Sequence, residues 1–197
     1  MQVGMKLKNS KEAILNQALA IFSRLGFNKT TMADIANASN RGRRTIYTYF
    51  NSKEEVFDAV VERELDKVLE TINQKLKNVE SADKKLAIYI ETRLNAIIEL
   101  TNYHEALHIA YLQNYKRVEY MRRKLDKAEG IILQEILELG KQQNKFQIEE
   151  LNIVLKNLSV LIRGVEFILI KEKKEILTDN HVNNIQQLII NGIIKKN

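Results

Sequence analysis

The chain has 197 residues, of which 45% are hydrophobic and 28% charged, and this composition excludes fibrous and wholly disordered proteins. It has no cysteine, no proline and only 7 glycines, which excludes disulfide frameworks and cysteine nucleophiles and favours long, uninterrupted helices. We expect an all-α protein. We also expect it to be cytoplasmic and not membrane-bound, because no segment resembles a signal peptide or reaches the length of a membrane span.

The net charge of +6 lies entirely in the first 51 residues. This segment has eight basic residues against two acidic ones, whereas the rest of the chain carries equal numbers of both signs. Lysine and arginine bind nucleic-acid phosphates and release their condensed counterions. The asymmetry therefore predicts binding to a polyanion such as DNA.

Three helices are expected in the basic segment. The first begins at Ser10 and ends before Gly26, because its apolar residues recur at helical spacing. The second begins with a capping box of Thr31 and Asp34, and a turn near Asn40 separates it from a third helix over residues 43–50. Two short helices joined by a tight turn predict a helix-turn-helix motif over residues 31–50.

Six further amphipathic helices are expected, so the predicted total is about nine. A capping box of Ser52 and Glu55 begins the first of them, and apolar residues at helical spacing define the rest. Their expected ranges are 52–78, 84–100, 103–113, 117–139, 149–174 and 182–194.

The residues from Gly26 to Val56 read GFNKTTMADIANASNRGRRTIYTYFNSKEEV. Gly and an aromatic residue precede Thr-Thr, and then Ile-Ala, Tyr-x-Tyr-Phe and Ser-Lys-Glu follow in order. This stretch resembles the DNA-binding signature of the TetR family of bacterial transcriptional regulators.

The resemblance implies a homodimeric repressor that binds a palindromic operator on double-stranded DNA and is released by a small-molecule effector. It implies a helix-turn-helix DNA-binding domain at residues 1–51 and a helical effector-binding and dimerisation domain at residues 52–197. It implies neither catalysis nor a cofactor.

Residues that match the family's motif are the expected DNA contacts. Base edges are expected to be contacted from the third helix, and phosphates from the residues around it. Arg41 stands where the family usually has a small apolar residue and adds a cation at the turn. The expected base contacts are Arg43, Arg44 and Thr45, and the expected phosphate contacts are Thr31, Tyr47, Thr48 or Tyr49, and Lys53.

His104, Glu105 and His108 spell H-E-x-x-H, in which two histidines one helical turn apart bind zinc and the glutamate acts as a base. An alternative function is therefore a zinc-dependent metallohydrolase. Two other interpretations remain: ordinary surface or hydrogen-bonded histidines, or residues of an effector pocket. The candidate pocket residues are Tyr89, Arg93, Tyr103, His104, His108 and Tyr111, whose rings would supply contact area and whose polar groups would orient a ligand.

Residues 151–170 are apolar on more than one helical face. Leu151, Leu155, Leu158, Ile162 and Val165 share one face, and Val160, Phe167 and Ile170 lie on another. A monomer could not bury both faces. We therefore expect a homodimer that is held together by the last two long helices.

Overall fold

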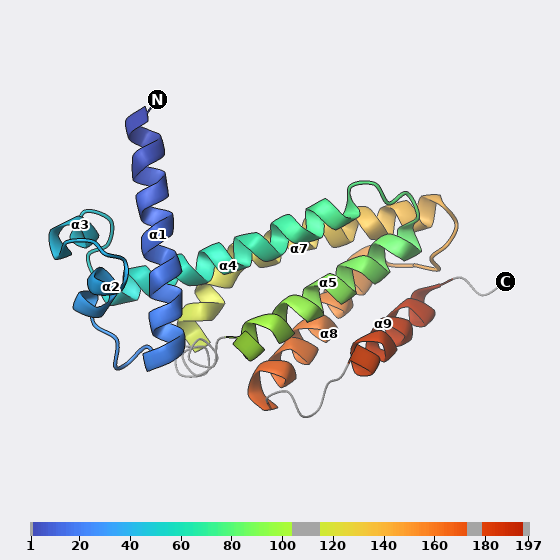
Figure 1. Cartoon of the computed structure of the whole chain (residues 1–197). Helices are drawn as coiled ribbons and strands as arrows, with labels where there is room; N and C mark the ends of the chain where they lie inside the picture. Colours follow the sequence, from blue (N-terminus) through green and yellow to red (C-terminus); the bar gives the residue numbers. More distant parts are fainter. Residues whose placement is uncertain (1, 104–114, 173–178, 195–197) are drawn as a thin grey trace. The chain divides into compact units, whose positions relative to one another are not determined.

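The computed structural model describes residues 2–103, 115–172 and 179–194, and these ranges contain eight α-helices and no β-strand (Figure 1). The all-α expectation is confirmed. Most of the expected helix at 103–113 lies outside the described residues. The helices are α1 (Gln2–Leu25), α2 (Met32–Ala38), α3 (Arg43–Tyr47), α4 (Lys53–Leu76), α5 (Ala82–Tyr103), α7 (Tyr115–Gln142), α8 (Leu151–Glu172) and α9 (Asp179–Ile193).

The chain forms two compact units, which we call the head unit and the body unit. The head unit comprises Met1–Leu65 and Tyr103–Arg122, and the body unit comprises Asp66–Asn102 and Arg123–Asn197. Helices α4 and α7 contribute residues to both units. The functional boundary expected between residues 51 and 52 stays a prediction.

The head unit is built around one hydrophobic core. Every described helix of the unit contributes to this core, including the first turns of α7. Helices of five and seven residues are too short to persist alone in water, so this shared burial stabilises α2 and α3. Among its buried contributors are Ile14, Ala18 and Phe22 from α1, Ile35 and Ala36 from α2, Ile46 from α3, Val56, Phe57 and Val60 from α4, and Val118 from α7.

Two helix ends differ from the sequence predictions. Helix α1 begins at Gln2 rather than at Ser10, because the Met, Lys and Leu residues before Ser10 are favourable helix formers and a serine alone does not end their helix. Helix α3 ends at Tyr47 rather than at residue 50. There the Thr48 hydroxyl donates to the Thr45 carbonyl at 2.6 Å, and such local bonds compete with continuation of a helix.

The cap of α4 matches its prediction in part. The Glu55 N–H donates to the Ser52 hydroxyl at 3.2 Å, as in the expected box. The Glu55 carboxylate, however, accepts from the backbone N–H of Asn51 at 2.7 Å and from its side-chain amide. The reciprocal bond of the capping box therefore goes to the residue before Ser52.

In the body unit, the segment between α7 and α8 is held by close packing and an ion pair. Phe146 is buried against Gly140, and Lys145 donates to Asp83 at 2.5 Å. Burial alone would raise the pKa of Asp83, but the hydrogen bonds from Lys145 and Ser81 outweigh it and lower this pKa to about 2. This segment therefore joins the end of α7 to the beginning of α5.

Replacing Gly140 with Ala should destabilise the protein by about 1–3 kcal/mol, because the new methyl group would overlap the buried Phe146 ring. Gly130, inside α7, is the matched control, since a Cβ there meets nothing within 4 Å. Gly130→Ala should stabilise the protein by about 0.5–1 kcal/mol through helix propensity. Urea unfolding measures both changes, and equal unfolding free energies for the two variants would contradict the packing described here.

Candidate nucleic-acid interface

Helix α3 exposes basic residues while one side chain anchors it. Ile46 is fully buried in the head core, whereas Arg43 and Arg44 are exposed and Thr45 is half-buried. The N-cap of α3 is Gly42, which has no side chain that could cap the helix. The first turn is held by the Gly42 carbonyl, which accepts from the Thr45 N–H at 2.9 Å. Two guanidinium groups and a hydroxyl on a short helix are suitable donors for base edges in the major groove.

The turn between α2 and α3 carries a third exposed arginine. Asn40 has a φ of 50°, in the left-handed region that asparagine tolerates better than most residues. The backbone N–H of Arg41 donates to the Ala36 carbonyl at 3.0 Å, and the Arg41 side chain is exposed. The predicted tight turn is confirmed, and three arginines occur within four residues of it.

The N-terminus of α2 has the predicted capping box. The Thr31 hydroxyl accepts from the Asp34 N–H at 3.2 Å, and the Asp34 carboxylate accepts from the Thr31 N–H at 2.9 Å. The hydrogen bond from the Thr31 hydroxyl to the Asp34 carboxylate, at 2.7 Å, and then the bond from the Thr31 N–H lower the pKa of Asp34. The Thr31 hydroxyl is thus engaged within the cap, and the free N–H groups of the first turn of α2 remain available to an anion.

The two tyrosines around the end of α3 have different environments. Tyr47 is 52% exposed, whereas Tyr49 is half-buried and packs against the head core. Thr48, between them, is exposed and donates its hydroxyl proton to the Thr45 carbonyl. Tyr47 is therefore the more accessible residue, and Tyr49 packs more closely against the core.

Lys53, the first residue of α4, contacts the loop that follows α1. Its ammonium group donates to the carbonyls of Phe27 and Asn28 at 2.9 and 3.3 Å. It also lies over the Phe27 ring, 4.6 Å from the centroid. The side chain expected to contact a phosphate is therefore hydrogen-bonded within the head unit.

The first turns of α7 belong to the head unit, which the sequence reasoning missed. Val118 and Met121 are buried in the head core. Arg117 forms a two-bond fork with Asp58 of α4, at 2.5 and 2.6 Å, and this pairing raises the pKa of Arg117. The two partners are 59 residues apart, so no local pattern in the sequence could reveal the pair.

Two candidate effector residues meet in the core of the body unit. Arg93 is 1% exposed and forms ion pairs with Glu129 of α7 at 2.5 Å and with Glu166 of α8 at 3.0 Å. Burial, followed by the negative charge of Glu129, raises the pKa of Tyr89 well above its usual value. Beside Arg93 in sequence, the buried hydroxyl of Thr92 has no hydrogen-bond partner in the described structure. A polar cluster in this core is the kind of feature that orients a bound ligand.

The remaining candidate pocket residues cannot be placed in the same way. His104, His108 and Tyr111 lie outside the described residues, as does Glu105 of the H-E-x-x-H motif, and the described part of Tyr103 is its backbone in α5. Elsewhere, within the described ranges, no cluster of three or more His, Asp or Glu side chains could hold a metal ion.

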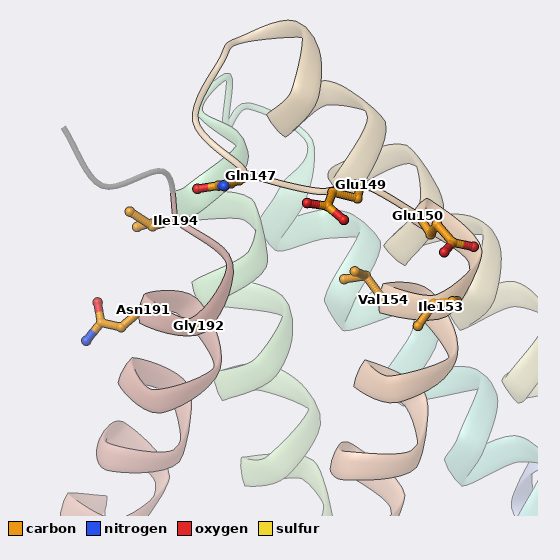
Figure 2. A pocket seen from close by; sticks show the side chains of 8 residues that line it. All are labelled: Gln147, Glu149, Glu150, Ile153, Val154, Asn191, Gly192 and Ile194. Atoms are coloured by element: carbon orange, nitrogen blue, oxygen red, sulfur yellow. The ribbon is translucent and has the colours of Figure 1, made fainter.

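A separate groove of about 620 Å³ lies in the body unit between the start of α8 and the end of α9 (Figure 2). Figure 2 shows the carboxylates of Glu149 and Glu150 above two aliphatic side chains of α8. None of the predicted site residues lines it. The lining residues are Gln147, Glu149, Glu150, Ile153, Val154, Asn191, Gly192 and Ile194.

Helix α3 is anchored in the head core by Ile46, exposes Arg43 and Arg44, and follows a tight turn. These features define a helix-turn-helix DNA-binding protein. Comparison with known proteins identifies the family. The family of bacterial regulatory proteins named tetR matches residues 14–60. The resemblance to the TetR family is confirmed over these residues, and the expected function of a ligand-responsive, DNA-binding transcriptional regulator is confirmed at the level of this class.

The matches to similar proteins extend beyond the residues of the head unit. The HTH-type transcriptional regulator YfiR of Bacillus subtilis is 28% identical over 144 residues, which are 71% of this chain and 70% of that protein. The regulator QacR of Staphylococcus aureus is 23% identical over 197 residues, 95% of this chain and 100% of that protein. A transcriptional regulator from Saccharomonospora viridis, solved in complex with choline, covers 96% of this chain and all of its own with a TM-score of 0.76 at 16% identity.

These similarities bear on the two functions considered from the sequence. They support a regulator, and the family is one of transcriptional regulators. They offer no support for a metallohydrolase. In the described part of the chain, no helix is long and apolar enough to cross a membrane.

Proposed function

We propose that the protein is a cytoplasmic, homodimeric repressor that binds a palindromic operator and is released by a small-molecule effector. The observation that carries the proposal is the set of three exposed arginines, Arg41, Arg43 and Arg44, on and beside an α3 helix fixed by Ile46. Their location within a segment of net charge +6 supports a polyanionic partner.

The proposed contacts divide into base-reading and phosphate-binding residues. Arg43, Arg44 and Thr45 would contact base edges, because a guanidinium group can donate two parallel bonds to guanine. Arg41 would add a cation where the recognition helix begins. The remaining proposed contacts, to phosphates, are Thr31, Tyr47 and Thr48 or Tyr49, of which Tyr47 and Thr48 are exposed.

Arg44→Ala should cost about 1–3 kcal/mol of binding free energy on a preferred duplex and relax the sequence preference, because a base contact is lost. Arg44→Lys keeps the charge without the planar fork, so it should also relax the preference. The matched control is Lys29→Ala, which removes an exposed cation of the head away from α3 and should weaken all sequences alike. Selection from a randomised duplex pool measures preference, and an unchanged preference for both Arg44 variants would disprove the assignment.

The proposed dimer interface lies on one face of α8. Leu158 and Ile162, from the first predicted face, are buried within the chain itself. Residues of another face remain exposed, and Leu188 of α9 is 75% exposed. Clustered exposed apolar side chains of this kind mark an interaction surface. Those on α8 are Ile153, Val160, Leu161, Phe167 and Ile168.

Val160→Glu should convert the proposed dimer to a monomer, because the carboxylate would lose water at a subunit interface. Ile131→Glu, on α7, is the matched control, since both residues are 61% exposed in the single chain. Sedimentation should give twice the chain mass of 22.9 kDa for the parent and for Ile131→Glu. A parent that sediments as a monomer at micromolar concentration would contradict the proposal.

The proposed effector site lies in the body unit beside Tyr89 and Arg93. Tyr103, His104, His108 and Tyr111 stay candidates on the basis of the sequence alone. The buried polar groups there would orient a mainly apolar ligand. The choline complex of the Saccharomonospora viridis regulator supports small-molecule binding by a protein of this fold. The two histidines would bind either the effector or a metal ion.

An effector found by a thermal-shift screen of lipophilic compounds and divalent metals should weaken operator binding about 5- to 150-fold. By thermodynamic reciprocity, saturating operator should weaken compound binding by the same factor. Tyr89→Phe, which removes one hydroxyl from the cluster, should reduce the thermal shift, whereas Tyr120→Phe on the exposed surface of α7 should not. A compound that binds the protein equally well with and without operator DNA would not be an effector, because its binding would not be coupled to DNA binding.

A further inference from the structure

Lys53 has an unusual position for a cation. It is the first residue of α4, where the positive end of the helix dipole disfavours a positive charge. Its ammonium group instead reaches the loop after α1, where it donates to two carbonyl oxygens and lies over the face of Phe27. Cations are favoured near the carboxyl end of a helix and over aromatic rings.

The loop that Lys53 contacts is otherwise held by a few specific contacts. Gly26 ends α1 with a φ of 80°, and its carbonyl accepts from the hydroxyl of Thr30 at 2.7 Å. The Phe27 ring lies 5.7 Å from Phe22 and 5.0 Å from Phe57, measured between centroids. Lys53 therefore lies over one ring, that of Phe27, of an aromatic cluster that joins α1 to α4.

This loop leads directly into the N-terminus of α2. Thr30 is buried, and Thr31 is the N-cap of α2. Since only Met32 to Ala38 separate that cap from the turn before α3, the position of the loop affects how the whole helix-turn-helix motif is presented.

We propose that Lys53 is a positioning residue for DNA binding rather than a phosphate contact. It binds the carbonyls of Phe27 and Asn28 and so fixes the α1–α2 loop against α4. Two of the three ammonium donors are used in this way. The proposal rests on the proposed DNA-binding function and assigns the mode of action of one of its residues.

The test compares Lys53→Met and Lys53→Arg with the parent. Methionine keeps an unbranched apolar stem over Phe27 but removes the charge and every donor, whereas arginine keeps both. The probe is a duplex selected by the parent protein from a randomised pool. Its affinity is measured over a series of salt concentrations at a temperature where all variants are folded, and hydrogen exchange of the Thr30 amide is measured without DNA.

Lys53→Met should lower affinity about 5- to 30-fold at every salt concentration, with the salt slope of the parent. The Thr30 amide, which donates to the Gly26 carbonyl at 3.3 Å, should exchange faster. Lys53→Arg should restore most of both properties. Lys29→Met, which removes an exposed charge from the same loop, should leave the Thr30 exchange rate unchanged.

Two results would overturn the proposal. A slope that falls by about 0.9 with unchanged Thr30 exchange would show that Lys53 binds a phosphate. Faster exchange with unchanged affinity would show an anchor that does not affect DNA binding. If Lys53→Met does not fold, Lys53→Gln, which retains one amide donor group, is measured against the same criteria.

The proposed function can fail separately from this inference. If the parent selects no sequence from the pool, the repressor proposal is wrong. The exchange rates of Lys53→Met and Lys29→Met would in that case still show whether Lys53 holds the loop.

Discussion

Burial of Ile46 is the interaction on which the recognition surface depends. A helix of five residues is not stable alone in water, because the nucleation of a helix is unfavourable. Helix α3 therefore forms because Ile46 and, just beyond it, Phe50 are buried in the head core. The same anchor determines which side chains remain outside. Arg43, Arg44 and Tyr47 are exposed because the position between them that faces inward is apolar. The exposure of the proposed DNA-contacting side chains is therefore a consequence of core packing.

The head core also requires residues from outside the N-terminal segment. Val118 and Met121 complete it from α7, and the fork between Arg117 and Asp58 aligns the start of α7 with α4. Each of these two long helices thus has buried residues in both units: Val60 and Ile72 in α4, and Val118 and Leu133 in α7.

Local patterns in the sequence were sufficient to predict most helices and the two short helices and turn of the helix-turn-helix, apart from the end of α3. Gly26, the box of Thr31 and Asp34 and the turn at Asn40 act within a few residues of themselves, so their signals are readable without the fold. The start of α1 was missed because favourable helix formers precede Ser10 and no residue there ends a helix. Contacts between distant residues were not predictable at all.

The fork of Arg117 with Asp58 and the cluster around Arg93 are examples of such distant contacts, since helical spacing shows that a residue faces inward but not what it meets. Arg93 illustrates the limit well. The sequence suggested a polar group in a ligand pocket, and the structure places it in a buried network with Glu129 and Glu166. The DNA-contacting and effector-contacting roles of individual residues depend on partners that are not part of this chain, so they stay proposals.

The proposed dimer explains how modest coupling could still operate a switch. A ligand shifts an equilibrium only by its difference in affinity for the two states, and a shift from 1:99 to 99:1 requires about 5.5 kcal/mol. Coupling between two sites is typically about 1–3 kcal/mol, which is too little for one protomer. On a palindromic operator both heads bind at once, so two effector molecules acting on one dimer contribute about 2–6 kcal/mol in total when the protomers respond independently. Only at the upper end of this range, about 6 kcal/mol, would a symmetric dimer reach nearly complete release of DNA, so the switch requires near-maximal coupling in each protomer.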